Sequence, residues 1–364
     1  MDIDSFLGQG LFFAGFIARH MVLMMYWVWI PGLFLSAFVA LRYRGVAAER
    51  VRRTEGGSLR SVLWGTLLGI TRTPDRRRSL LASLDLFREG LHPATAFAVY
   101  LSSRNLVLYF LTVWMLLLGI EFAVGQVIGA LAMIALASAG LRRAMRRKEW
   151  DPLRDRLQSH WADGATAHDE PGETSWRALL LSGRGWGKVI VYIGREIRRF
   201  ALPVAVGILA GGFILAAGLQ PWWVDLGSVG GEAFWTDLLN AFVGPALSLV
   251  AAVGPVGSLP VASNLFKAYG IAYPGLVAFV LAGALKPQDI ATLSRVFGGR
   301  AALRLTALFY LSAVIAGLIA TGVFALFGFR PGHVPLFREL VDAIIMWVVP
   351  GMSNMPGMGG FGGM

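Results

Sequence analysis

A short polar stretch, residues 254–267, interrupts a part of the chain that is otherwise nearly free of polar groups. It contains Gly257, Ser258, Pro260 and Asn264, which either disfavour helix or offer hydrogen bonds. Inside a bilayer, backbone groups without hydrogen-bond partners cost several kcal/mol each, so a broken helix persists only inside protein or beside a watery cavity. The stretch therefore predicts a binding site for a small solute.

The composition is that of an integral membrane protein. Hydrophobic residues occupy 56% of 364 positions, charged residues only 15%, and the mean hydropathy is +0.61. The net charge of +11 comes largely from arginines beside apolar runs, which the positive-inside rule explains without a nucleic-acid partner. The absence of cysteine excludes disulfides, thiolate metal ligands and cysteine nucleophiles.

Arginines indicate the direction of the chain through the membrane. Arg42, Arg44 and further arginines follow the first apolar run, so that end is predicted to be cytoplasmic and the amino terminus external. A shorter apolar piece, 61–71, is predicted to be re-entrant or interfacial, and a second one, 238–253, to be the corresponding re-entrant element of the other half. Pro31 is expected to kink the first span. Six spans are predicted, at 21–41, 94–120, 122–141, 200–220, 275–293 and 302–327.

One segment, 142–199, has the composition of a soluble linker. It contains thirteen Lys or Arg residues against eight Asp or Glu, and is therefore predicted to be cytoplasmic. It would separate a first membrane repeat, 1–141, from a second, 200–338. The remaining residues, 339–364, are a short apolar piece and a tail rich in Met and Gly.

The two membrane parts share a sequence pattern. Segment 85–93 (DLFREGLHP) aligns with 264–274 (NLFKAYGIAYP), and each begins 44 positions after the preceding span ends, at Leu41 and Gln220. Because the charge bias gives those two spans opposite directions, the repeats are predicted to be inverted, as in secondary transporters. The predicted fold class is an all-α integral membrane protein of two inverted repeats, with about six spans and two re-entrant or broken elements.

Two cations are equivalent under this alignment. Arg104 lies opposite Lys286, and each precedes a residue that disfavours helix, Asn105 or Pro287. A cation inside an apolar run needs a cavity, a counter-charge or an anionic solute. Alternatively, each cation marks the end of a span and extends to the lipid headgroups. The first interpretation makes Arg104, Asn105 and Lys286 candidates for solute binding.

Two acids lie near the predicted broken elements, Asp85 and Asp289. Either could couple transport to a proton or ion gradient, and Asp85 is included among the candidate binding residues. The alternative is that both are solvated at a membrane edge. No cofactor and no enzymatic activity are expected, because the scattered histidines and the absence of HExxH, P-loop and GxSxG motifs favour neither a hydrolase nor a nucleotide-driven pump.

The second membrane part resembles a known family. The motif 257–262 (GSLPVA), with Gly270-Ile271 and 278–280 (AFV) after it, is similar to that of predicted permeases that include bacterial organoarsenical efflux proteins. Leu86, Arg88, Gly90, 96–97 and Asn105 carry the resemblance in the first part. The resemblance covers about 74–141 and 238–328 and implies a permease.

One departure from that family is large. Many members have Cys-Ser-Cys-Gly where this chain has residues 75–78 (DRRR), so capture of arsenic or mercury by paired thiolates is in doubt. These arginines could attract a phosphate-like or carboxylate anion, or form a positive patch beside the membrane. Met352, Met355 and Met358 of the tail could hold Cu(I) or Ag(I), or could be incidental in a disordered terminus.

These observations predict a secondary permease that moves a small solute by alternating access, with efflux as the implied direction. The solute could be an anion or a metal or metalloid compound. The expected setting is a bacterial-type inner membrane, and the expected partners are the solute and the lipid bilayer. The alternatives are a non-transporting scaffold or sensor that uses the segment 142–199, and a copper- or silver-related protein that uses the tail.

Overall fold

The protein is built from helices. Within the described residues all regular structure is helical, and six helices are long and apolar enough to cross a membrane, which confirms the predicted all-α class. The computed structural model describes residues 5–24, 29–54, 56–72, 76–144, 147–160, 175–220, 234–251, 256–268, 271–329 and 331. The six helices are Ile30–Arg53, Pro93–Met115, Ile120–Arg143, Gly183–Gly218, Phe234–Ala251 and Gly299–Leu326.

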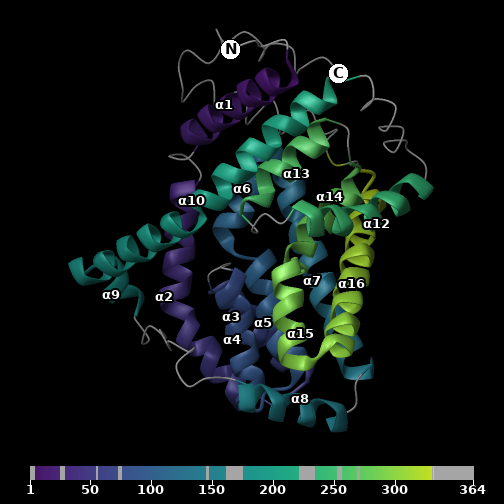
Figure 1. Cartoon of the computed structure of the whole chain (residues 1–364). Coiled ribbons are helices and arrows are strands. Elements are labelled where there is room, and N and C mark those ends of the chain that lie inside the picture. Colours follow the sequence, from purple (N-terminus) through teal and green to yellow (C-terminus); the bar gives the residue numbers. More distant parts are fainter. Residues whose placement is uncertain are drawn as a thin grey trace.

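The helices of the first part precede two helices in the predicted linker (Figure 1). Those of the first part are Phe6–Met24 (α1), Ile30–Arg53 (α2), Leu59–Ile70 (α3), Arg76–Arg88 (α4), Pro93–Asn105 (α5), Leu108–Leu118 (α6) and Ile120–Ala144 (α7). Those of the linker are Arg147–His160 (α8) and Trp176–Leu180 (α9).

The helices of the second part follow in a similar order of lengths. They are Gly183–Gly218 (α10), Phe234–Ala251 (α12), Ser258–Lys267 (α13), Tyr273–Leu281 (α14), the short 3₁₀ helix Ala282–Ala284 (η3), Pro287–Phe297 (α15) and Gly299–Leu326 (α16). In each part a long helix, α2 after α1 or α10 at the start, precedes the shorter helices, and another long helix, α7 or α16, comes last.

Equivalent helices also have equivalent neighbours in the two parts. Helix α3 packs on α5 as α12 packs on α14, and α5 packs on α7 as α14 packs on α16. The last two helices of each part are joined through a glycine with positive φ, Gly119 at 122° and Gly298 at 82°. A residue with a side chain rarely adopts this conformation, so glycine suits both links. These features support an internal repeat, while its inverted orientation stays a prediction.

Two predicted spans are broken near their equivalent cations. The run predicted at 94–120 consists of α5 and α6, with Leu106 and Val107 between them. The run predicted at 275–293 is divided before Pro287, which begins α15 because proline is tolerated in a first helical turn. The residues expected to disfavour helix, Asn105 and Pro287, therefore lie at these breaks.

The first predicted span, 21–41, contains parts of two described helices. Helix α1 ends at Met24 and α2 begins at Ile30, while residues 25–28 lie outside the described residues. Pro31 was expected to kink this span. It lies instead in the first turn of α2, where the backbone N–H that proline lacks would have had no intrahelical partner.

Other boundaries also differ from the sequence prediction. Helix α10 begins at Gly183, inside the segment predicted as a linker, and α12 is long and apolar enough to cross although 238–253 was expected to be re-entrant. Much of the polar stretch 254–267 is helical, as α13. The tail, with Met352, Met355 and Met358, and the apolar piece 340–349 lie outside the described residues.

Glycines on α10 permit close helix packing. A Cβ atom at Gly207 would collide with the carbonyl oxygen of Gly257, and one at Gly211 would lie 2.6 Å from the amide nitrogen of Asn264. On the other side of α10, Gly212 would meet the backbone of α1 at Gly10. Small residues spaced by four allow such backbone contact in membrane helices. Gly207 and Gly211 therefore let α13 pack directly against α10.

We predict that Gly207→Ala destabilises the protein, by about 1–3 kcal/mol, because the added methyl group overpacks the contact with α13. The matched control is Gly194→Ala on the same helix, where a Cβ atom meets nothing within 4 Å. This control should be neutral or stabilising, since alanine favours helix by up to about 1 kcal/mol. Thermal unfolding in detergent measures both, and a Gly207 variant as stable as the control would contradict the packing.

Candidate functional site

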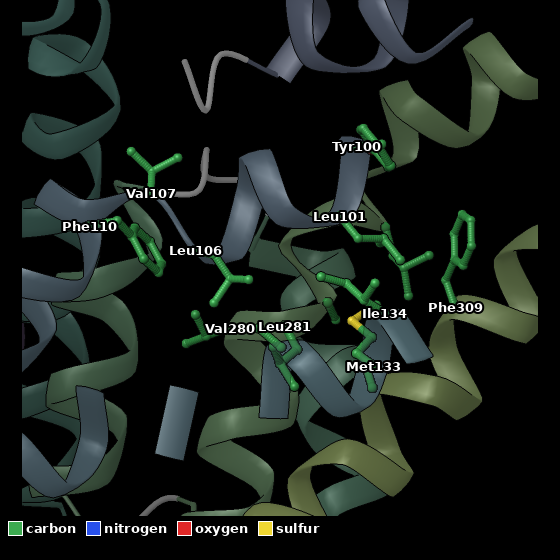
Figure 2. Close-up of a cluster of buried hydrophobic side chains, with 14 of the residues drawn as sticks. Tyr100, Leu101, Leu106, Val107, Phe110, Met133, Ile134, Val280, Leu281 and Phe309 are labelled. Atoms are coloured by element: carbon green, nitrogen blue, oxygen red, sulfur yellow. The ribbon is translucent and has the colours of Figure 1, made fainter. Parts of the chain in front are cut away.

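The two helix breaks lie beside each other in the protein interior. The side-chain amide of Asn105 donates to the carbonyl oxygens of Leu101, at 3.1 Å, and of Leu281, at 3.4 Å. Figure 2 shows Leu106, from the first break, near Val280 and Leu281 of α14. Asn105 thus joins the end of α5 to the end of α14.

A buried ion pair connects the same two breaks. The guanidinium nitrogen Nη2 of Arg104 lies 2.8 Å from Oδ2 of Asp289, and the two side chains are 0% and 4% exposed. Arg104 lies in the last turn of α5 and Asp289 in the first turn of α15, so each charge opposes the partial charge of its own helix end. Tyr100 accepts a further hydrogen bond from Arg104 at 3.3 Å.

Lys286 is equally buried but has different partners. Its ammonium group donates to the backbone oxygen of Ser248 at 2.5 Å and to the hydroxyl of Ser248 at 3.0 Å. Its nitrogen also lies 6.0 Å from the ring centroid of Phe279. Because Arg104 and Lys286 are both 0% exposed, the alternative that they extend to lipid headgroups is wrong. The two acids likewise differ from the solvated alternative, since Asp289 is 3% and Asp85 7% exposed.

The place where the α5–α6 break meets the α14–α15 break is called the crossing. Gln126 adds a polar group from α7 to this crossing. Its amide nitrogen lies 3.4 Å from Oδ1 of Asn105, which accepts this hydrogen bond. Within the described structure its own oxygen, Oε1, is buried without a hydrogen-bond partner. Sequence reasoning missed Gln126, although it is the one polar side chain between Phe122 and Ala137. Tyr100 and Ser248 were missed because such residues are also common in ordinary helices.

A further buried acid, Glu196, lies on α10. Its carboxylate is paired with Arg199 at 2.7 Å and accepts a hydrogen bond from the hydroxyl of Tyr109 at 3.2 Å. The backbone N–H of Tyr109 donates to the hydroxyl of Ser36 on α2 at 2.9 Å. These contacts join α10 and α2 to the start of α6. Sequence reasoning missed this role, because Glu196 lies among arginines that indicate a solvated surface.

The residues of the GSLPVA motif lie in a separate contact. Gly257 precedes the first turn of α13, Ser258 and Asn264 are buried, and the amide of Asn264 donates to the carbonyl oxygen of Pro260 at 2.7 Å. Close packing against the glycines of α10 places these residues between α13 and α10. Helix α13 also contacts α6 and α14, which carry the crossing.

In the structure, Asp85 lies neither at the crossing nor at the contact between α13 and α10. It lies on α4, 3.7 Å from Arg88 in the next turn of the same helix. The nearby end of α4 is covered by α8, whose Arg154 donates to the carbonyl oxygens of Phe87 and Leu91. A role for Asp85 in solute binding stays a prediction.

Comparison of the sequence with known proteins identifies relatives of this chain. A family described as a predicted permease matches residues 12–322. The putative permease Rv2963 of Mycobacterium tuberculosis is 25% identical over 265 residues, which is 71% of this chain and 65% of that protein. The match thus spans less than two thirds of the mycobacterial protein. No solved structure matches the chain.

We predict that Arg104→Gln destabilises the protein by about 3–5 kcal/mol, because it leaves the Asp289 carboxylate buried without its cation. Adding Asp289→Asn should recover much of this loss, since both charges are then gone. Free energies of unfolding in mixed micelles measure this double-mutant cycle.

The exposed pair of Arg53 and Glu49 provides the control, with side chains 76% and 51% exposed. Arg53→Gln should cost at most about 1 kcal/mol. Additive losses in the Arg104 and Asp289 variants would contradict a direct ion pair.

Proposed function

Because this chain belongs to the family of predicted permeases, we propose that it is a secondary carrier with its solute site at the crossing of the α5–α6 and α14–α15 breaks. Broken helices expose backbone groups and helix ends that can replace the hydration of a solute. The observation that carries the proposal is the Arg104–Asp289 ion pair, which joins the two breaks from opposite membrane parts. A buried charge pair is costly, and function is a reason to retain it.

The ion pair supports an exchange of partners during transport. An anionic solute that binds the guanidinium of Arg104 would release Asp289, and protonation of Asp289 would then remove the buried negative charge. A carboxylate or an oxyanion matches the planar guanidinium, which can donate two parallel hydrogen bonds. The solute classes proposed are therefore small organic anions and oxyanions, with organoarsenicals among them because of the family resemblance.

Two aromatic contacts support opening at alternate ends. At one end the ring of Phe87 lies 5.8 Å from that of Phe297, and at the other the ring of Phe266 lies 5.1 Å from that of Phe122. Phe87 and Phe266 are equivalent in the sequence alignment, and Phe297 and Phe122 lie beside the equivalent glycines of the last helix link. Each contact thus closes one repeat against the other.

The cytoplasmic end is proposed to be the one covered by α8, in line with the arginine distribution. Figure 1 shows α8 at the end of the bundle that lies away from α1 and α13. The ring of Trp150 on α8 packs 5.7 Å from that of Phe87, so α8 covers this contact. The membrane proposed is a bacterial-type inner membrane, with the amino terminus outside.

We predict that a cysteine at Asn105 reports this alternation, which the cysteine-free chain makes simple to measure. With Phe87→Ala, a membrane-impermeant thiol reagent should label Asn105→Cys faster from the cytoplasmic side. With Phe266→Ala it should label faster from the outside. Val99→Cys, on the same helix and fully buried, is the control and should stay unreactive in both backgrounds.

Labelling of Asn105→Cys from the same side in both backgrounds would contradict alternating access. The absence of labelling in every background would show that the crossing is a closed structural core, as expected of a scaffold.

We also predict that the double variant Arg104→Gln/Asp289→Asn folds but does not transport. Everted vesicles measure uptake of a panel of small carboxylates, oxyanions and organoarsenicals, with the wild-type protein and empty vesicles as references. Uptake of a panel member by the wild type should fall at least tenfold in the variant, because the anion loses its guanidinium. Equal uptake by both would exclude Arg104 from the site, and Arg53→Gln controls for loss of an exposed arginine.

A further inference from the structure

Residues 176–199, which comprise α9 and the start of α10, form an arm at the side of the bundle. Figure 1 shows this arm extending away from the bundle beside α2. Its inner side, with Leu179 and Val189, packs on Ala37 and Leu41 of α2. The arm is thus fixed to the first membrane part along one side only.

An apolar part of the arm remains exposed. Its exposed side chains are Leu180, Leu181, Trp186, Ile190 and Val191, which are 40–83% exposed. Helix α8 of the same predicted linker differs, because its apolar side chains are buried against the bundle. These are Trp150, Leu153 and Leu157. Exposed apolar side chains grouped beside a membrane helix indicate contact with lipid.

A basic stripe runs along α10 on the side roughly opposite Trp186 and Ile190. Arg184, Lys188 and Arg195 are exposed, and their spacings of four and seven residues put them on one side of α10. Trp186 and Ile190, also spaced by four, lie about half a turn away from that side. Basic side chains on one face of a helix and apolar side chains on the other are typical of a helix at an anionic membrane surface.

The contacts of the arm with α2 place it at the membrane boundary. Trp186 packs on Phe38 with ring centroids 5.6 Å apart, and Trp176 packs on Tyr43 at 6.1 Å. Between these two contacts α2 changes from apolar to basic, at Arg42. Tryptophans are enriched at this depth, where one part of the ring is in hydrocarbon and the N–H near water.

The length of α10 also indicates that the arm lies at the membrane boundary. Its 36 residues correspond to about 54 Å, whereas the hydrocarbon core is about 30 Å thick. The apolar part from Phe200 to Gly218 is long enough for most of that thickness, so the part before Phe200 lies at or beyond the boundary.

We propose that the arm is an interfacial element that binds the headgroups of anionic phospholipids. Its apolar stripe enters the outer acyl region, and Arg184, Lys188 and Arg195 contact the headgroup phosphates. The segment 176–199 is then part of the membrane-bound structure. It was expected to be a free cytoplasmic linker.

Thermal unfolding of the full chain in phosphatidylcholine micelles tests the proposal, with phosphatidylglycerol added in steps. The unfolding temperature of the wild type should rise with added phosphatidylglycerol. In the triple variant Arg184→Gln/Lys188→Gln/Arg195→Gln, half-maximal stabilisation should need roughly a hundredfold more of this lipid. Each lost charge should lower the affinity for the anionic lipid roughly fivefold.

The matched control neutralises three other exposed arginines, Arg295, Arg300 and Arg304, on α15 and α16. It should keep at least half of the stabilisation by phosphatidylglycerol. Equal losses in both triple variants would show a general effect of positive charge and overturn the specific surface. An unchanged response in the arm variant would overturn it as well.

A second measurement tests depth without relying on stability. A fluorescent label on Ile190→Cys in vesicles containing phosphatidylglycerol should shift to the blue and be quenched by spin-labelled lipid. The same label on Gln288→Cys, at an exposed site on α15, is the comparison and should be quenched less. An Ile190 label that is fully solvated in these vesicles would show that the stripe serves another partner, such as a protein, and would overturn the proposal.

Discussion

The buried ion pair of Arg104 and Asp289 is the interaction on which the rest of the site depends. Two opposite charges removed from water repay their desolvation only with close geometry and further hydrogen bonds. The protein supplies the 2.8 Å contact and a hydrogen bond from Arg104 to the hydroxyl of Tyr100, and the helix ends that carry the two charges add favourable partial charges. The pair lies where α5 ends and α15 begins, so the ion pair and the two helix breaks occupy the same place in the protein.

The surrounding contacts follow from the same constraint. Each break frees backbone groups that need partners inside the protein. Asn105 binds a carbonyl oxygen at the end of α14, and Lys286 binds the backbone of α12. Glycines at the α10–α13 contact let the backbones approach closely, so that little space is left between the elements. If the crossing binds a solute, as we propose, it has to open, and the aromatic contacts at its two ends are suited to control that opening.

The sequence predicted the parts that depend on hydropathy and backbone chemistry. Long apolar runs indicated an all-α membrane protein, and Asn105 and Pro287 indicated where two helices break. The equivalence of Arg104 and Lys286 located the crossing, since a charge in an apolar run needs a specific environment. These signals are local, so one sequence is enough to detect them.

Partners and depth could not be predicted in this way. Asp289 lies among polar residues that equally suit a solvated edge. Its partner Arg104 is 185 positions away in the sequence, and only the fold brings the two together. Gln126 is a single amide in an apolar run, and Glu196 is surrounded by arginines. The start of α10 inside the predicted linker could not be foreseen, because charged residues occur on one side of this helix while another side packs on α2.

The central claim is that the two ends of the crossing open alternately. Spin-label distances measure this directly. One pair is at Glu89→Cys and Arg295→Cys, each two residues from the Phe87–Phe297 contact, and a second pair is at Lys267→Cys and Val124→Cys, one and two residues from the Phe266–Phe122 contact. In an Asp289→Asn background, which releases the ion pair, lengthening of one distance should accompany a short distance at the other end. Distances that lengthen together at both ends, or that stay unchanged at both, would contradict the account.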